Sequence, residues 1–595
     1  SGTSRRTPAR VDCNTSTVSR VPVEWTANHG TIDAVQNAVA ELDAARRICP
    51  FVLPQTLRDW AAECAARLGD VAHEWVALAA KAKGLSRDDP ATVEDVLTGP
   101  VLVARQFRML IGSLDTVVGD GRSMPAANPF VDATGRGCLP VFPVPGLFDP
   151  LVFIAFRGWV RLREGLDPRQ VADRLGEAFV RTVEHDPKIA VVLGAGNVSS
   201  IPATDMMEKV FLQRRRVLLK LNPVNDYLGP VFQHAFAPLI EGGVLRIVTG
   251  DATIGQAAVD HELVDEVHIT GSNRAFEAIV WGADPDERAE NRRRGTPRLR
   301  KPITAELGNV SPWIVIPGRY DRSELKFVAR NIAASITNNC GFNCAATRVI
   351  VTARDWPQRA AFVAALKEAL HATPLRRAYY PGAVERFCRF APENVPRPLG
   401  DVIPWTLIEG VRPEDDPEFF RQEAFTPLAM EVTLPGPADG ESFLDAAAAF
   451  CNERLWGTLT AAVSVPGRFL PTRSYRNLAT RIAARLRYGV VGINCWPGVA
   501  YVIGSLPWGG FPGGTLENPR SGIGFVHNPF MIPEAAIEQS VLVAPNVTYP
   551  KPIWFASHPN PVPVAWRLFD LYCSPGWARA SRLMLEAFRW GWRWP

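Results

Sequence analysis

Short runs of β-branched residues alternate with amphipathic stretches through the middle of this chain, and this alternation constrains its fold more than any other feature. The first runs occupy 189–193, 217–221, 244–248 and 264–269. A strand–helix–strand order of this kind favours a parallel sheet with crossover helices on both faces. The segment is therefore predicted to form a doubly wound α/β domain that binds a dinucleotide cofactor.

A second series of runs follows a polar, charge-rich segment at 283–300. These runs predict another α/β domain with the same layered organisation. They lie at 313–316, 348–351, 428–432, 459–463 and 490–493.

The two ends of the chain differ from this pattern. Apolar residues recur with helical periodicity at 32–48, 57–78 and 93–110, which predicts a helical N-terminal region. The last 90 or so residues are rich in Pro, Gly and Trp and end in an amphipathic segment at 580–594. We expect this segment to pack on the protein itself or on a sister subunit; the alternative is contact with a membrane surface.

The length of 595 residues is enough for two or more domains. The predicted fold class is α/β, with two doubly wound parallel-sheet domains between a helical N-terminal region and an extended C-terminal tail. The expected boundaries are 1–130 for the helical region, 131–305 for the dinucleotide-binding domain, 306–500 for the second α/β domain and 501–595 for the tail.

The composition indicates a folded protein without a large surface of one charge. The chain is 47% hydrophobic and 21% charged, and 65 basic residues nearly balance 61 acidic ones. We therefore expect no nucleic-acid partner. No apolar stretch reaches the roughly 18 residues that a transmembrane helix needs. Ten cysteines at irregular spacing do not indicate a disulfide framework, so a cytoplasmic location is expected.

Several catalytic signatures are absent from the sequence. It contains no HExxH, no Gly-x-Ser-x-Gly, no Walker lysine loop and no pair of CxxC units. Zinc hydrolases, serine hydrolases, NTPases and zinc fingers depend on these motifs, and no bound metal is expected.

Two segments carry the residues with the clearest chemical potential. Cys344 follows a glycine-containing turn and precedes a predicted strand in Asn-Asn-Cys-Gly-Phe-Asn-Cys-Ala-Ala-Thr-Arg (338–348). Glu306 lies upstream in Glu-Leu-Gly-Asn-Val-Ser-Pro (306–312). A thiolate is nucleophilic near neutral pH, and a partly buried carboxylate can act as a base.

In order and spacing these segments resemble the aldehyde dehydrogenase superfamily, in which Glu-Leu-Gly-Gly-x-x-Pro precedes Gly-Gln-x-Cys. The resemblance runs from about residue 188 to 525 and covers seven elements in the family's order. It implies that Cys344 attacks an aldehyde to form a thiohemiacetal and that Glu306 is the general base. The alternatives are a small buried cysteine and a capping or salt-bridged glutamate. Asn309 departs from the family's second glycine.

The resemblance also implies an oxyanion donor. Asn197 stands in Gly-Ala-Gly-Asn (194–197), where the family has Pro-Trp-Asn. By this match its side-chain amide would stabilise the tetrahedral intermediate; the alternative is a helix N-cap after a glycine turn. Cys340 has no nearby His or further Cys to complete a metal site, so it is expected to be a structural thiol.

The same resemblance assigns residues to a nicotinamide cofactor. Lys220 matches the lysine of Lys-Pro-x-Glu, whose ammonium binds the adenine ribose. Pro223 stands where the family's glutamate favours NAD, so both NAD and NADP are compatible with the sequence. Glu423 and Phe425, in Glu-Ala-Phe-Thr-Pro, resemble the family's Glu-x-Phe-Gly-Pro, which implies a contact with the nicotinamide ribose and ring.

Glycines after two predicted strands complete this set. Gly250 and Gly255 follow the run at 244–248, and Gly271 precedes Ser272 in Ile-Thr-Gly-Ser. They resemble the family elements that hold the pyrophosphate through backbone N–H groups and a serine hydroxyl at a helix N-terminus. The alternative for Ser272 is a helix cap without a ligand.

These matches imply NAD(P)-dependent oxidation of a small-molecule aldehyde to a carboxylic acid, by a protein that forms a homo-oligomer. One alternative is an acyl-thioester reductase that runs the chemistry backwards, because Asn197 followed by Pro202 also resembles long-chain acyl reductases. Retention of Glu306 argues against it, since enzymes that pass the acyl group to a thiol commonly lack this base. The other alternative is an inactive relative that keeps the fold for assembly.

Overall fold

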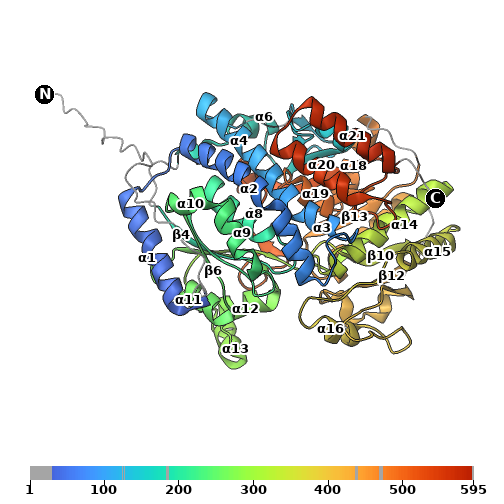
Figure 1. The fold of residues 1–595 in the computed structure, drawn as a ribbon. Helices are drawn as coiled ribbons and strands as arrows, with labels where there is room; N and C mark the ends of the chain where they lie inside the picture. Colours follow the sequence, from blue (N-terminus) through green and yellow to red (C-terminus); the bar gives the residue numbers. More distant parts are fainter. Residues whose placement is uncertain are drawn as a thin grey trace.

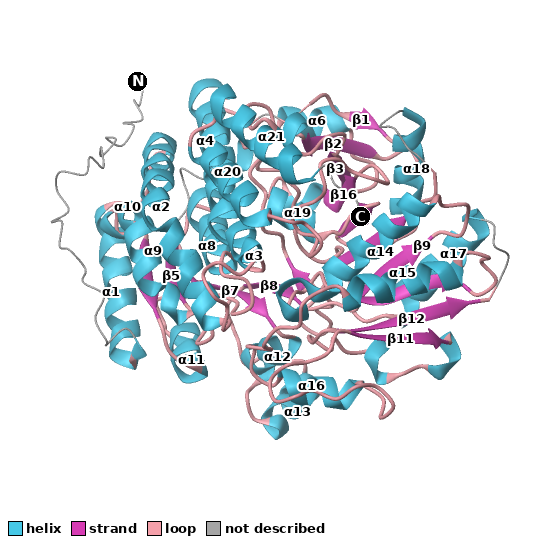
Figure 2. Ribbon diagram, turned by 45° about the vertical axis from the view of Figure 1, so that its right-hand side comes forward, coloured by secondary structure: helices cyan, strands magenta, loops and turns pink. Residues whose placement is uncertain are grey.

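Two β-sheets with helices packed around them form the core of the protein (Figures 1 and 2). The structure, a computed structural model, describes residues 30–123, 125, 127–181, 187–435, 440–467 and 473–591. The fold class predicted from the sequence is confirmed: both sheets are mainly parallel, and helices separate successive strands.

The smaller sheet has six strands in the order β15-β8-β7-β4-β5-β6. Five of them are parallel, and β15 is antiparallel to β8. Every residue of β5 is buried, as expected for a sheet covered on both faces. The bounds are β4 (Ile189–Leu193), β5 (Arg216–Lys220), β6 (Leu245–Val248), β7 (Glu266–Gly271), β8 (Ile303–Leu307) and β15 (Gly522–Ile523).

The larger sheet has ten strands in the order β1-β2-β3-β16-β14-β13-β9-β10-β12-β11. The seven strands from β16 to β11 are parallel, and the first three are antiparallel to their neighbours. The bounds are β1 (Phe130–Val131), β2 (Gly137–Phe142), β3 (Arg157–Leu162), β9 (Ser311–Val315), β10 (Thr347–Ala353), β11 (Thr406–Val411), β12 (Leu428–Leu434), β13 (Thr460–Ser464), β14 (Val490–Ile493) and β16 (Ile537–Val543).

Sheet membership divides the sequence differently from the expected boundaries. Strands β2 and β3 lie in the segment 131–305, yet β3 pairs with β16 and β2 with β3, so both join the larger sheet instead of the smaller one. Strand β15, from the segment 501–595, extends the smaller sheet. The reason is physical: these are pairings between distant segments, which no local pattern of apolar residues encodes.

The predicted helical N-terminal region is present. Its elements are α1 (Ile32–Ile48), α2 (Pro54–Ala82), α3 (Thr92–Val96), the π-helical turn η2 (Leu97–Val101) and α4 (Leu102–Asp120). Helix α1 packs against β5 and β6, whereas α2 packs against α4 and α9. The region is therefore part of the core that surrounds the cofactor sheet, as Figure 1 shows.

Helices also follow the strands of both sheets. Helix α14 begins with a capping box, in which Asp321 accepts the backbone N–H of Glu324 and Glu324 accepts that of Asp321. The remaining helices are α5 (Asp149–Val152), α6 (Pro168–Asp173), α7 (Glu177–Arg181), α8 (Ile201–Met207), α9 (Gly229–Ala235), α10 (Ala237–Glu241), α11 (Ala252–Asp260), α12 (Asn273–Trp281), α13 (Pro285–Arg294), α14 (Arg322–Thr337), α15 (Arg359–His371), α16 (Ala383–Phe390), α17 (Gly440–Arg454), α18 (Arg473–Ala483) and α19 (Gly498–Ile503).

The tail ends in two helices, α20 (Pro561–Cys573) and α21 (Trp577–Gly591), which pack against each other. Helix α20 contacts α3 and α4, and α21 contacts α5, so the C-terminal helices lie over the N-terminal ones (red over blue in Figure 1). No described helix is both long and apolar enough to cross a membrane.

A buried ion pair joins these distant segments. The Arg105 guanidinium on α4 donates to both carboxylate oxygens of Asp149 on α5, at 2.6 and 2.8 Å, and to the Tyr572 hydroxyl on α20 at 2.8 Å. Its Nε donates to the carbonyl of Ile503 at 2.6 Å. Arg105 is 1% exposed and Asp149 is fully buried, so each charge depends on the other.

Removing one member of this pair should therefore destabilise the fold. We expect Asp149→Asn to lower the free energy of unfolding by about 3–5 kcal/mol, because it leaves the Arg105 guanidinium buried without its counter-charge. Asp115→Asn is the control: Asp115 pairs with Arg58 at 2.8 Å on the surface, where loss of the pair costs under about 1 kcal/mol. Urea unfolding measures both; equal midpoints would contradict the structural role of the buried pair.

Candidate active site

The predicted nucleophile lies in a loop between α14 and β10. The short 3-10 turn η6 (Asn338–Gly341) starts this loop, and its residues Asn339, Cys340 and Gly341 have left-handed φ angles of 51°, 54° and 73°. A Cβ at Gly341 would lie 2.9 Å from the Cα of Pro427, so only glycine fits there. The turn brings Cys344 to the amino ends of the parallel strands of the larger sheet, next to Ser311 at the start of β9.

Cys344 is a free thiol with partial solvent exposure. Its sulfur lies 4.0 Å from Oδ1 of Asn343, and its carbonyl accepts a hydrogen bond from Ser311 Oγ at 3.2 Å. The next residue, Ala345, donates its N–H to Asn343 Oδ1 at 2.9 Å and accepts the indole N–H of Trp496 at 2.7 Å. The residues on both sides of the thiol are thus fixed by hydrogen bonds.

The structure brings Glu306 to Cys344. Glu306 comes from the carboxyl end of strand β8 in the other sheet and is 5% exposed. Burial and the nearby Asp205 carboxylate raise the pKa of Glu306 to about 8, although hydrogen bonding with the Cys344 side chain opposes the rise. Burial and the charge of Glu306 raise the pKa of the Cys344 thiol well above its ordinary value. A carboxyl with a pKa near neutral pH suits a general acid and base.

Asn197 also reaches the loop. It follows β4, is 8% exposed, and donates its side-chain amide to the carbonyl of Phe342 at 3.2 Å. Its own carbonyl accepts hydrogen bonds from Asn339 Nδ2 at 2.7 Å and from the Tyr379 hydroxyl at 2.8 Å. The N-cap of the following helix, α8, is Ser200, so the alternative of Asn197 as a helix cap does not hold.

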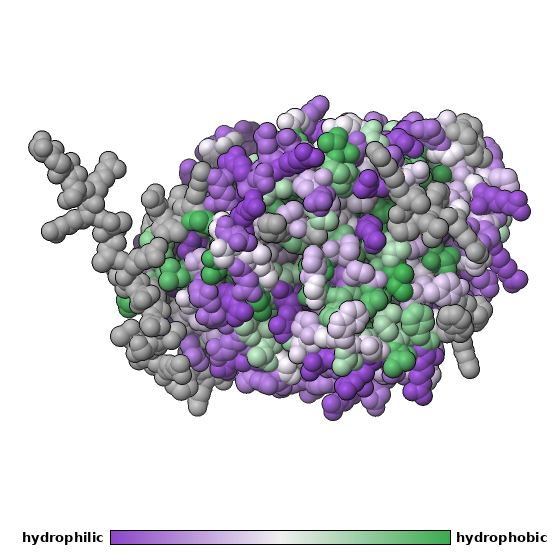
Figure 3. All heavy atoms as spheres, turned by 90° about the horizontal axis from the view of Figure 1, so that it is seen from above, coloured by the Kyte–Doolittle hydropathy of each residue, from purple (hydrophilic) through white to green (hydrophobic). Residues whose placement is uncertain are grey.

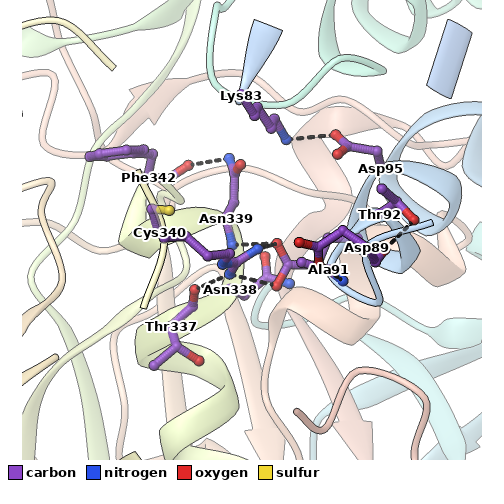
Figure 4. A network of polar contacts seen from close by, with 12 residues as sticks. Lys83, Asp89, Ala91, Thr92, Asp95, Thr337, Asn338, Asn339, Cys340 and Phe342 are labelled. Carbon is purple, nitrogen blue, oxygen red and sulfur yellow. Dashed lines mark hydrogen bonds and ion pairs between the residues drawn. The ribbon is translucent and has the colours of Figure 1, made fainter. Parts of the chain in front are cut away.

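A group of residues missed by the sequence reasoning anchors the same loop from the N-terminal region (Figure 4). The Glu94 carboxylate on α3 accepts the backbone N–H of Asn339 at 2.9 Å and two hydrogen bonds from Arg376 at 2.8 and 3.0 Å. Arg376 also donates to the carbonyl of Thr337 at 2.8 Å. The only sequence signal was a pair of acidic residues in the first turn of a short helix, which usually indicates a dipole effect.

The Glu94 contact should hold the nucleophile loop in place. In Glu94→Ala, the Arg376 guanidinium and the Asn339 N–H lose their partner, so amide hydrogens of residues 337–342 should exchange about tenfold faster or more, as expected when a hydrogen-bonded charge pair is lost. Hydrogen exchange followed by mass spectrometry measures this effect. Asp88→Ala, at an exposed position of the preceding loop, is the control and should leave the exchange unchanged. Unchanged exchange in Glu94→Ala would contradict the anchoring role.

The predicted cofactor residues of the first sheet gather at one edge. Lys220 ends β5 and Gly250 follows β6, and these neighbouring strands are parallel to β4, after which Asn197 lies. Lys220 is 7% exposed, and burial lowers its pKa to about 8 against the attraction of Asp251. Carboxyl ends of parallel strands are the usual place for a dinucleotide.

Three further predicted residues lie at helix starts along this edge. Gly250 has a φ of 114°, and a Cβ there would come within 2.6 Å of Ile254; Gly255 is buried in the second turn of α11. Gly271 ends β7, and Ser272 accepts the N–H of Ala275 at 3.2 Å as the N-cap of α12. Ser272 thus caps its helix. The backbone at Gly250 lies too close to the Ile254 side chain at the start of α11 for any residue with a Cβ.

Glu423 lies close to the thiol from the other side. Burial raises its pKa to about 7, although Arg348, 3.9 Å away, attracts its charge. A Cβ at Gly308 would lie 2.0 Å from Oε2 of Glu423, which explains the glycine after Glu306-Leu307. Oε1 of Glu423, the atom nearest Arg348, is buried and has no hydrogen-bond partner among the described residues.

Phe425 belongs to an aromatic cluster beside this carboxylate. Its ring lies 5.2 Å from that of Tyr380 and 5.9 Å from that of Phe342. The Arg386 guanidinium lies 5.8 Å from the ring. The cluster makes a flat apolar wall next to Glu423 and the nucleophile loop. Phe342 itself lies two residues before Cys344.

A second set of polar residues, which the sequence analysis did not identify, lies near Glu306. Asp205, on α8, accepts a hydrogen bond from Thr270 Oγ1 at 2.7 Å and lies 3.4 Å from Nε2 of His268. His268 and Thr270 alternate on β7, and the other ring nitrogen of His268 is 2.9 Å from Thr304 on β8. Polar residues at alternating positions of an otherwise apolar strand were the available signal. Among the described residues, no cluster of His, Cys, Asp and Glu has the makings of a metal site.

The mutual effect of Glu306 and the Cys344 thiol on their pKa values predicts how the reactivity of Cys344 depends on pH. Above its pKa of about 8, Glu306 is charged and opposes ionisation of Cys344. In Glu306→Gln this charge is lost, so the thiol pKa should fall. At pH 9 the rate of Cys344 alkylation by iodoacetamide should then rise about tenfold for each unit by which the thiol pKa falls. Mass spectrometry follows the rate at this site. Glu393→Gln, at an exposed position, is the control; identical profiles for both variants would rule out the contact.

Comparison with known families agrees with this geometry. Residues 222–383 match the model of the aldehyde dehydrogenase family. The matched range contains Glu306, Cys344 and Tyr379. No curated protein matches the chain.

Solved structures with the same fold cover most of the chain. A γ-glutamyl-γ-aminobutyraldehyde dehydrogenase from Burkholderia cenocepacia is 20% identical, with a TM-score of 0.56 over 86% of this chain and 89% of that one. An aldehyde dehydrogenase from Pseudomonas aeruginosa is 18% identical, with a TM-score of 0.56 over 86% and 89%. An NADP-dependent glyceraldehyde-3-phosphate dehydrogenase from Bacillus halodurans, complexed with NADP, is 17% identical, with a TM-score of 0.55 over 86% and 92%. At these identities the likeness concerns the fold.

Proposed function

We propose that the chain is a divergent member of the aldehyde dehydrogenase superfamily and an NAD(P)-dependent enzyme that oxidises an aldehyde to a carboxylic acid; the family match over residues 222–383 and the shared fold support this. The observation that carries this proposal is that the buried Glu306 carboxyl and the Cys344 thiol, contributed by different sheets, are close enough to shift each other's pKa. Cys344 is a free, partly exposed residue.

Cys344 is the nucleophile in this reaction. Glu306 takes the thiol proton, and the thiolate attacks the aldehyde carbon to give a thiohemiacetal on Cys344. A bound nicotinamide would supply the acceptor for the hydride that leaves this carbon, and loss of this hydride with the hydroxyl proton would leave a thioester on Cys344. Glu306, after releasing the thiol proton to solvent, removes a proton from water. The resulting hydroxide equivalent releases the acid from the thioester, and Glu306 returns a proton to the Cys344 thiolate. The raised pKa of Glu306, about 8, fits alternate uptake and release of a proton.

Two donors would stabilise the oxyanion that forms during attack. These are the side-chain amide of Asn197 and the backbone N–H of Cys344, in a site that limits water and therefore strengthens electrostatic interactions. The Asn197 amide is oriented by its contact with Phe342 O, and the Asn339 and Tyr379 hydrogen bonds hold the Asn197 backbone. Preorganisation of this kind costs no rearrangement at the moment of reaction.

The residues present fit a dinucleotide at the strand ends. Lys220 would bind the adenine ribose, while Gly250, Gly255, Gly271 and Ser272 would surround the pyrophosphate near the starts of α11 and α12. The close backbone approach at Gly250 and the buried ammonium of Lys220 support this assignment.

The nicotinamide end of the cofactor would lie beside the nucleophile loop. Glu423, whose Oε1 lacks a partner among the described residues, would accept from its ribose, and Phe425 would back the ring. Pro223 offers no carboxylate against a 2′-phosphate, so NAD and NADP are both proposed.

Turnover by defined variants tests this function. We expect NADH or NADPH to form when the purified protein receives an aldehyde with NAD or NADP. Cys344→Ser should lose at least about a thousandfold of the activity because the nucleophile is gone. The activity of Glu306→Gln should fall about 10²- to 10⁴-fold because the base is gone, even though the Cys344 thiol of this variant ionises more easily. Cys388→Ser, at an exposed cysteine, is the matched control and should keep full activity.

The same assay separates the rival functions. Formation of an aldehyde from an acyl thioester and reduced nicotinamide, with no oxidation of aldehydes, would establish the reductase instead. A folded protein that turns over neither substrate, and whose Cys344 alkylation is independent of Glu306, would establish an inactive relative.

A further inference from the structure

An apolar chamber lies beside the nucleophile loop, between the N-terminal helices and the C-terminal tail. Its empty volume is about 1120 Å³, part of which is open to solvent. The walls come from η2, the α5 segment, α19, the tail residues 548–554 and helices α20 and α21. A concave apolar space with a few polar groups in its lining is the usual form of a small-molecule site.

The chamber and the active site share a wall. Asn338 and Trp496 both line the chamber. Oδ1 of Asn338 accepts the side-chain amide of Asn343 at 3.4 Å, and the indole N–H of Trp496 donates to the carbonyl of Ala345 at 2.7 Å. Asn343 and Ala345 are the two neighbours of Cys344, so two lining residues of the chamber each hold a residue next to the predicted nucleophile.

The lining favours an apolar chain. Most of it is aliphatic and aromatic, including Val502 on α19, Val564 on α20 and Met584 on α21. It has two charged residues: Glu94 is paired with Arg376, and the ammonium of Lys551 donates to the carbonyl of Ser557 at 3.2 Å. A hydrocarbon chain would gain free energy by leaving water for these apolar walls.

We propose that this chamber binds the hydrocarbon chain of a long-chain aldehyde, whose carbonyl carbon reaches Cys344. The proposal rests on the proposed function and adds a substrate class to it. Exposed apolar side chains continue the lining outward: Ile154 is 40% exposed and Tyr549 is 47% exposed. Figure 3, a view from above, shows hydrophobic residues in green between hydrophilic ones on the surface. An entering chain thus meets apolar surface before the interior.

The first experiment measures binding without catalysis. Calorimetry with 1-decanol, an uncharged chain that cannot be oxidised through a thiohemiacetal, reports occupancy of the chamber. We expect Met584→Trp and Val502→Trp to weaken binding at least about tenfold, because the indole fills space the chain requires. Leu585→Trp is the matched control, since Leu585 neighbours Met584 on α21 but is 73% exposed and lies outside the lining. Equal binding by all three variants would overturn the proposal.

The second experiment measures turnover of straight-chain aldehydes from two to fourteen carbons. In the wild type, kcat/KM should rise about threefold for each methylene buried in the chamber, and then level off. Met584→Trp should flatten this rise, and Leu585→Trp should behave as the wild type. The same kcat/KM for short and long chains would overturn the chamber as a substrate site and leave the proposed function intact. Decanol binding that Met584→Trp abolishes, in a protein that oxidises no aldehyde, would instead overturn the proposed function.

Discussion

The active site depends on a left-handed backbone turn that ordinary residues adopt at a cost. Asn339 and Cys340 have positive φ angles without being glycine, a conformation that costs of the order of 1–3 kcal/mol per residue and persists only when its surroundings determine it. The surroundings here are specific: Glu94 accepts the Asn339 N–H, and the Asn339 side chain bonds the carbonyls of Asn197 and Phe342. Hydrogen bonds therefore connect the turn that precedes Cys344 to Asn197, the proposed oxyanion donor.

The sequence predicts the layers of the fold well and their connections poorly. The runs at 189–193 and 217–221 become β4 and β5 because a strand buried on both faces must be apolar throughout. The pairing of β3 with β16 and of β15 with β8 has no such local signature. Those pairings depend on which sheet edges remain open once the rest of the chain has packed, and this is decided by tertiary structure.

The same division applies to the site. Cys344 and Glu306 could be predicted because thiol and carboxylate chemistry leaves a motif, and the two groups are close enough in the structure to raise each other's pKa. Glu94 and Arg376 left no motif, because a single charge on a short helix or in a loop is indistinguishable in sequence from a solvated one. Asn197 was ambiguous for a similar reason, since Ser200 three residues later could equally start the helix, and it does.

The antiparallel pairing of β3 with β16, Leu162 with Ile537, has a consequence for biosynthesis. During translation the antiparallel pair β2 and β3 leaves the ribosome long before β16 exists. The edge of β3 therefore stays unpaired while the central part of the chain is made. Contacts of such high sequence separation slow folding and expose strand edges to aggregation. A nascent chain of this kind is an expected client of chaperones, and loss of the last part of the coding sequence would leave a hairpin with nothing to pair with, whatever the state of the catalytic loop.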